Sequence, residues 1–174
     1  MLLVVTGPPG AGKSTVAQLV ADELDPSVLI EGDAFFGFIH RGAIAPWLPE
    51  SRAQNVAVIQ AAASAAGRYT QGGLETVYDG VVGPWFLSEF AAATGLDRLD
   101  YVLLLPSVDE CVERVATRIG HGFTDEPATR KMHADFAGAE VDERHVLRDP
   151  RGDAPMVARA ILSELASDRF AYRP

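Results

Sequence analysis

The sequence contains a single cysteine, Cys111, among 174 residues. One thiol cannot form a disulfide within the chain, so a disulfide-stapled scaffold is excluded and a reducing compartment is the natural interpretation. Long hydrophobic runs are missing as well. Runs such as Leu2–Val5 and Val102–Leu105 fall far short of the roughly 20 residues that a helix needs to cross a bilayer. The start of the sequence has no basic leader, so we expect no signal peptide, no membrane partner and a cytoplasmic location.

Positive charge is also scarce, with 15 Lys and Arg against 24 Asp and Glu and a formal net charge of -9. A surface that binds a nucleic-acid backbone needs clustered Lys and Arg, so nucleic acid is not an expected partner. The hydrophobic fraction of 48% and charged fraction of 22% are those of a globular chain. The length suits a single domain over residues 1–174, as a monomer or a homodimer.

Short apolar runs alternate with longer helical patterns, which is typical of an α/β fold with a parallel sheet. Ser51 is expected to cap the second helix. Ser107 and Glu110 form a capping box for the fourth. The expected strands cover residues 2–5, 28–30, 74–78, 101–105 and about 145–147, and the expected helices begin near residues 13, 51, 84, 107, 126 and 154.

The segment from Gly7 to Ser14 matches the phosphate-binding pattern G-x-x-x-x-G-K-[ST], between an apolar strand and an amphipathic helix. Glycines let backbone N–H groups surround phosphates, and the helix adds its positive dipole end. Lys13 can reach the β- and γ-phosphates and Ser14 can ligate Mg²⁺, so ATP and Mg²⁺ are the expected cofactors. The alternative is a turn that only joins strand to helix. The predicted binding residues are Gly7, Pro8, Pro9, Gly10, Ala11, Gly12, Lys13, Ser14 and Thr15.

Two aspartates follow strands whose ends should meet the P-loop. Asp79 is followed by glycine and not by the Glu of an Asp-Glu pair, which disfavours a motor ATPase. We expect Asp79 to be a magnesium ligand or an acceptor contact. The alternative is a turn residue. Asp33 lies 20 positions after Lys13, where a carboxylate could accept a proton from an acceptor hydroxyl. The alternative is that it caps a short helix beginning near Ala34.

With these motifs the chain resembles the small P-loop kinases grouped around gluconate kinase, shikimate kinase, adenylylsulfate kinase and chloramphenicol phosphotransferase. The resemblance rests on Gly7 to Thr15, on Glu31-Gly32-Asp33 and on Arg114 with Arg118 before a glycine-flanked loop. It implies a three-layer α/β fold, with a five-stranded parallel sheet in the order 2-3-1-4-5 and helices on both faces. The chain departs from gluconate kinases after Asp33, where it lacks their His-Pro pairing.

The resemblance also implies a lid at about residues 119–127, with Arg114 and Arg118 closing on the transferring phosphate as catalytic residues, and Arg118 also binding nucleotide. The alternative for Arg114 is an ion pair with Glu110 one helical turn away. Residues 34–50 are irregular and aromatic, and we interpret them as the acceptor-binding segment.

The prediction is an ATP-dependent kinase that acts on a hydroxyl of a small molecule. Catalysis is assigned to Lys13, Asp33, Arg114 and Arg118, and metal binding to Ser14 and Asp79. A neutral acceptor fits best, although Arg41 and Arg52 could clamp one carboxylate. Two alternatives remain: an antibiotic phosphotransferase of the chloramphenicol type, and a regulatory protein that holds ATP without transferring phosphate.

Overall fold

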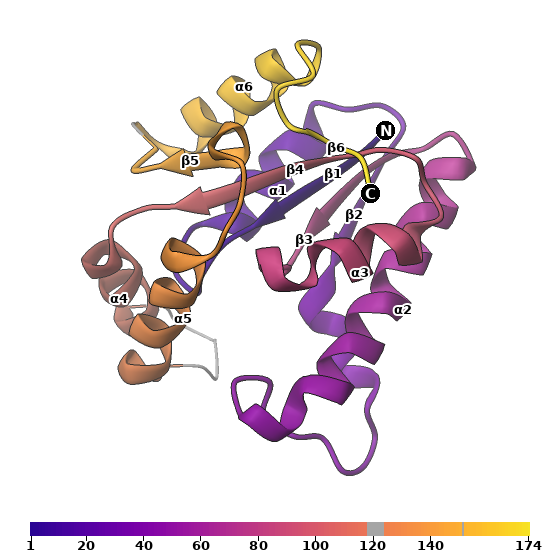
Figure 1. Ribbon diagram of the computed structural model, residues 1–174. Coiled ribbons are helices and arrows are strands. Elements are labelled where there is room, and N and C mark those ends of the chain that lie inside the picture. The colour runs from indigo at the N-terminus through magenta and orange to yellow at the C-terminus, as the bar shows by residue number, and fades with distance from the viewer. Residues whose placement is uncertain (118–123, 151) are drawn as a thin grey trace.

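The computed structural model describes residues 1–117, 124–150 and 152–174, which form a parallel sheet with helices on both faces (Figure 1). The strand order is β2-β3-β1-β4-β5, which confirms the predicted order 2-3-1-4-5. The strands are β1 (Leu2–Thr6), β2 (Ser27–Glu31), β3 (Glu75–Asp79), β4 (Leu99–Leu105) and β5 (Val146–Arg148).

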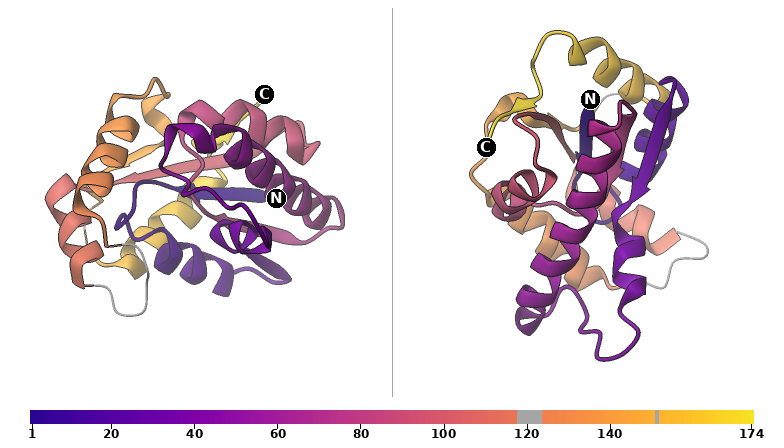
Figure 2. Two further views of the ribbon diagram at one scale, coloured as in Figure 1. Left: turned by 90° about the horizontal axis from the view of Figure 1, so that it is seen from below. Right: turned by 90° about the vertical axis from the view of Figure 1, so that its right-hand side faces the viewer.

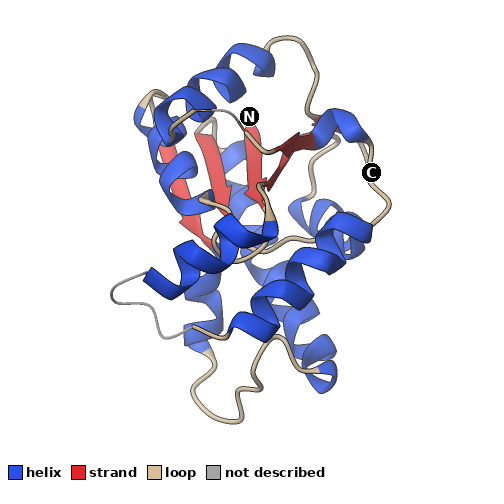
Figure 3. Ribbon diagram, turned by 90° about the vertical axis from the view of Figure 1, so that its left-hand side faces the viewer, coloured by secondary structure: helices blue, strands red, loops and turns tan. Residues whose placement is uncertain are grey.

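The helices divide into two covering layers and one pair beyond the sheet (Figures 1 and 3). Because side chains alternate along a strand, Leu3 and Val5 of β1 pack with α1 and α6, whereas Leu2 and Val4 pack with α2 and α3. No helix in the described ranges is long and apolar enough to span a bilayer. The helices are α1 (Lys13–Asp22), α2 (Arg52–Gln71), α3 (Pro84–Thr94), α4 (Val108–Thr117), α5 (Glu126–Gly138) and α6 (Ala154–Leu165).

One predicted cap is confirmed and one is wrong. The Glu110 N–H donates to Ser107 Oγ at 3.4 Å while the Ser107 N–H donates to Glu110 Oε2 at 3.3 Å, as a capping box requires. The side chain of Ser51 makes no cap to α2. A 3₁₀ turn, Pro49–Ser51, already precedes the helix, so the Ser51 hydroxyl donates instead to the carbonyls of Pro46 and Leu48.

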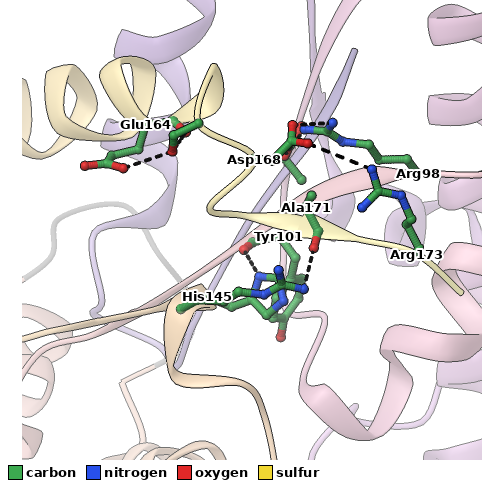
Figure 4. A network of polar contacts seen from close by, with 10 residues as sticks. Arg98, Tyr101, His145, Glu164, Asp168, Ala171 and Arg173 are labelled. Atoms are coloured by element: carbon green, nitrogen blue, oxygen red, sulfur yellow. Dashed lines mark hydrogen bonds and ion pairs between the residues drawn. The ribbon is translucent and has the colours of Figure 1, made fainter.

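The C-terminal strand β6 (Ala171–Tyr172) pairs antiparallel with β4 and was not predicted. Asp168, with a positive φ of 59°, turns the chain into this strand. Its carboxylate pairs with the guanidinium groups of both Arg98 and Arg173 (Figure 4). Two residues are too few to show a period, so only these tertiary contacts define β6.

His145 is buried beside β4, and we expect it to couple folding to pH. Its Nδ1 lies 3.1 Å from the Tyr101 carbonyl oxygen (Figure 4). Burial lowers the pKa of His145 below its ordinary value of 6.5, and the charge of Arg144 acts in the same direction. The unfolded chain therefore takes up this proton first as the pH falls, and the free energy of unfolding decreases below about pH 6.5.

We therefore expect the melting temperature to fall between about pH 8 and about pH 5.5, and the fall to be smaller in His145→Gln. Thermal unfolding of both proteins in matched buffers measures this difference. An equal fall in the two proteins would show that His145 does not couple folding to pH.

Candidate active site

A cavity of about 630 Å³ lies at the carboxyl ends of β1, β2 and β3. In this class of sheet, ligands bind at that edge. The segment before α2 and the α4–α5 pair both lie beyond the same edge (Figures 1 and 2). The described residues that line it are Pro9, Gly10, Gly12, Lys13, Ser14, Gly32, Asp33, Phe36, Pro46, Trp47, Leu48, Pro49, Ser51, Arg52, Asn55, Ile59, Tyr78, Asp79, Val81, Trp85, Phe86, Val115, Ala128, Lys131, Met132 and Asp135.

The predicted P-loop divides into residues that line the cavity and residues that support them. Lys13 begins α1, and its ammonium donates to the Pro8 carbonyl at 3.3 Å. Gly12 before it has a φ of 89°, which turns the chain into the helix. Thr15 is exposed and does not line the cavity. The lining residues of the loop are Pro9, Gly10, Gly12, Lys13 and Ser14, whereas Gly7, Pro8 and Ala11 are buried without lining it.

Gly10 shows why this loop needs glycine. Its φ is +81°, and a Cβ added there would come within 2.3 Å of the Cys111 carbonyl oxygen at the start of α4. Gly10→Ala should therefore lower the free energy of unfolding by roughly 1–3 kcal/mol and weaken nucleotide binding.

Denaturant unfolding and nucleotide titration test this expectation. Gly138→Ala is the matched control, because a Cβ at Gly138 would meet no atom within 4 Å. A Gly10→Ala protein as stable as the control, with unchanged nucleotide affinity, would contradict it.

Sheet register brings a second predicted residue, Asp79, to the loop. At the end of β3, Asp79 is in register with Glu31 of β2 and with Val5 of β1. Burial raises the pKa of Asp79, while the hydrogen bond from Ser14 and the charge of Lys13 lower it. The Asp79 Oδ1 is buried and has no hydrogen-bond partner among the described residues.

Asp33 lines the cavity from the first turn of the 3₁₀ helix Gly32–Phe38. The cap position of that helix is Glu31, and no side chain caps it, so the alternative interpretation of Asp33 as a cap is wrong. The charge of Asp33 raises the pKa of both Tyr78 and Asp79, in addition to the larger effect of burial. Asp33 and Lys13 are therefore both close enough to Asp79 for their charges to change its pKa.

Arg114 contacts the P-loop from α4. One guanidinium nitrogen donates to the Gly10 carbonyl at 3.4 Å, and another pairs with Glu110 at 3.5 Å. The alternative of an ion pair with Glu110 is therefore confirmed, whereas the contact of Arg114 with the transferring phosphate stays a prediction. Arg118 lies outside the described residues, as does the predicted lid except for residues 124–127.

The aromatic segment contributes part of its side chains to the cavity. Phe36 and Trp47 line it, whereas Phe35 packs edge-on against Phe38 with 5.4 Å between ring centroids. Phe38 itself is 76% exposed. The segment therefore both lines the cavity and presents an apolar surface outside it.

Three residues of α2 line the cavity: Arg52, Asn55 and Ile59. Of these, sequence reasoning named only Arg52 as a possible acceptor contact. The Arg52 guanidinium lies 5.6 Å from the Phe86 ring centroid, while Arg41 does not reach the cavity. Asn55, which was missed, is only 8% exposed. An asparagine near the start of an alanine-rich helix is a poor helix former, and that is the signal that could have identified it.

The donor set fits Mg²⁺. The metal prefers oxygen ligands and is commonly held by few protein groups together with substrate phosphates. The Ser14 hydroxyl and the unpartnered carboxylate oxygen of Asp79 are such groups, on adjacent elements of the cavity wall.

The model of the AAA domain family matches residues 2–139. The chain therefore belongs to this family, within the P-loop class that the fold and phosphate loop define. No curated protein matches the sequence significantly.

Solved structures resemble the chain over nearly its whole length. A sugar kinase from Janibacter sp. HTCC2649 has a TM-score of 0.73 at 21% identity, covering 95% of this chain and 94% of that one. The tunicamycin resistance protein of Deinococcus radiodurans has a TM-score of 0.67 at 11% identity, and the match covers 95% of both chains. A gluconokinase from Sinorhizobium meliloti 1021 has a TM-score of 0.65 at 22% identity, and the match covers 95% of this chain and 91% of that one. The fold is thus that of a P-loop kinase.

Proposed function

We propose that this protein is an ATP-dependent phosphotransferase that phosphorylates a hydroxyl group of a small molecule. The observation that carries the proposal is that Asp33 and the P-loop residues Lys13 and Ser14 line one cavity. A P-loop protein that only holds ATP and Mg²⁺ needs no second carboxylate in this cavity beyond a metal ligand such as Asp79. The sugar kinase and gluconokinase folds support the same class of reaction.

The chemistry follows from the position of these groups. The acceptor oxygen attacks the γ-phosphorus, the bond from phosphorus to the ADP oxygen breaks, and the hydroxyl proton passes to the Asp33 carboxylate. Lys13 stabilises the charge on the transferring group. Arg114 and Arg118 are proposed to add to that stabilisation. Ser14 and Asp79 would hold Mg²⁺, which neutralises phosphate charge when bound.

Charge in the cavity favours an acceptor with at most one anionic group. Beyond the P-loop, the described lining includes two cations, Arg52 and Lys131, and the Lys131 ammonium bonds Asp135 at 2.7 Å. A nucleoside monophosphate, which is gripped by several arginines, fits this lining poorly. Apolar walls including Trp47 and Phe86 suit a ring or the C–H face of a sugar.

The experiment is a phosphate-transfer screen with radiolabelled ATP. Neutral sugars and polyols, sugar acids, hydroxyl-bearing antibiotics, nucleoside monophosphates and DNA ends serve as matched acceptors. Transfer to a sugar, polyol or sugar acid is the expected result. Transfer only to an antibiotic would select the chloramphenicol type of enzyme instead. Tight ATP binding without transfer to any acceptor would identify a regulatory protein and refute the proposal.

A further inference from the structure

Asn55 stands on the face of α2 that lines the cavity. Arg52, Asn55 and Ile59 are spaced three and four residues apart, which places them along one stripe of the helix. All three line the cavity. A guanidinium, a carboxamide and an apolar side chain of this stripe thus line the cavity over two helical turns.

The carboxamide of Asn55 is satisfied on one side only. Its Nδ2 donates to the Pro46 carbonyl at 2.7 Å and to Ser51 Oγ at 2.9 Å. A carbonyl can only accept, so the contact with Pro46 determines which end of the amide is nitrogen. The Asn55 Oδ1 is buried and has no partner among the described residues.

A buried carbonyl oxygen without a donor is unfavourable, and native proteins usually pair such groups. The amide cannot turn to pair the oxygen without giving up both bonds of its nitrogen. Pro46 and Ser51 hold the amide in this orientation, and no donor among the described residues bonds its oxygen. Asn55 lines the same cavity as Asp33.

We propose that Asn55 Oδ1 accepts a hydrogen bond from a second hydroxyl of the acceptor, one that is not phosphorylated. This rests on the proposed function, in which Asp33 takes the reacting hydroxyl. A molecule that serves both residues through hydroxyl groups must carry at least two of them, as sugars, sugar acids and polyols do. Asn55 thereby selects these molecules over monohydroxyl compounds of similar size.

The test uses the two tryptophans of the chain, Trp47 and Trp85, because both line the cavity. Their fluorescence reports binding without catalysis. D-glucose, D-gluconate and D-sorbitol are titrated in the presence of a non-hydrolysable ATP analogue. The monodeoxy analogues of the tightest probe follow.

In the wild type, loss of one particular non-reacting hydroxyl should weaken binding roughly tenfold. Asn55→Ala should bind the parent probe roughly tenfold more weakly and should no longer distinguish it from that deoxy analogue.

Gln54→Ala is the matched control for a merely structural effect. The Gln54 amide holds the same segment through both the N–H and the carbonyl of Ile44, yet Gln54 does not line the cavity. It should keep the discrimination between parent and deoxy probes. If Asn55→Ala fails to fold, Asn55→Ser keeps a hydroxyl donor without the carboxamide oxygen and should lose the discrimination.

The outcomes separate the inference from the function on which it rests. Transfer to the parent probe, with every deoxy analogue bound equally well by the wild type, overturns the role of Asn55 and leaves the kinase intact. Equal loss of discrimination in Gln54→Ala and Asn55→Ala also overturns it, because the segment and not the oxygen would then be responsible. Failure of all three probes to bind overturns the acceptor class.

Discussion

Replacing Lys13 by methionine is expected to abolish phosphoryl transfer while the fold stays intact. Methionine has a similar length and lacks the charge. The ammonium lies at the start of α1, bonds the Pro8 carbonyl and lowers the pKa of Asp79 by its charge. Loss of a charge that stabilises the transferring phosphate should cost on the order of 3 kcal/mol or more, a rate loss of at least about 100-fold.

Single-turnover transfer and thermal unfolding of the variant measure these two expectations. Lys131→Met is the control, because it removes the same charge from the only other lysine, whose ammonium bonds Asp135. The rate of phosphoryl transfer should fall less than about tenfold in that control, since the contact of Lys131 is an exposed ion pair. Near wild-type turnover in Lys13→Met would refute the central claim.

Asp33→Asn is expected to lose transfer by roughly 10²–10⁴-fold while still binding ATP, the usual effect of removing a positioned base. Asparagine keeps the shape and cannot accept the proton of the acceptor hydroxyl. Asp33 lies in the first turn of Gly32–Phe38, lines the cavity and raises the pKa of Asp79. Removing its charge should also lower the pKa of Asp79.

Glu31→Gln provides the comparison for Asp33→Asn. Glu31 ends β2 one strand away from Asp79 and also raises the pKa of that residue, yet it does not line the cavity. Turnover and nucleotide affinity are measured for both variants at saturating ATP. If both variants lost turnover equally, the loss would come from removing negative charge near Asp79 and not from preventing proton transfer to Asp33. A parallel loss of ATP affinity would assign Asp33 to metal binding or to a structural role.

Much of the fold followed from local patterns. The apolar runs and the glycine turn predicted the strands, and the capping box of Ser107 and Glu110 predicted the start of α4. Ser51 was misassigned because it ends the 3₁₀ turn Pro49–Ser51 before α2, and its side chain makes no capping hydrogen bond to the helix. That turn depends on contacts with Pro46 and Leu48, which no period in the sequence reveals.

The P-loop, the helix that follows it and the strand-end aspartates were determined by the sequence itself, because steric rules and hydrogen bonding within a few residues decide such features. Only the tertiary structure decided which side chains share the cavity. Sheet register placed Asp79 beside β1. The contact between α2 and Pro46 turned the amide of Asn55 so that its oxygen has no partner among the described residues. Pairing of polar groups far apart in the chain is a property of packing, so it appears only when the elements are assembled.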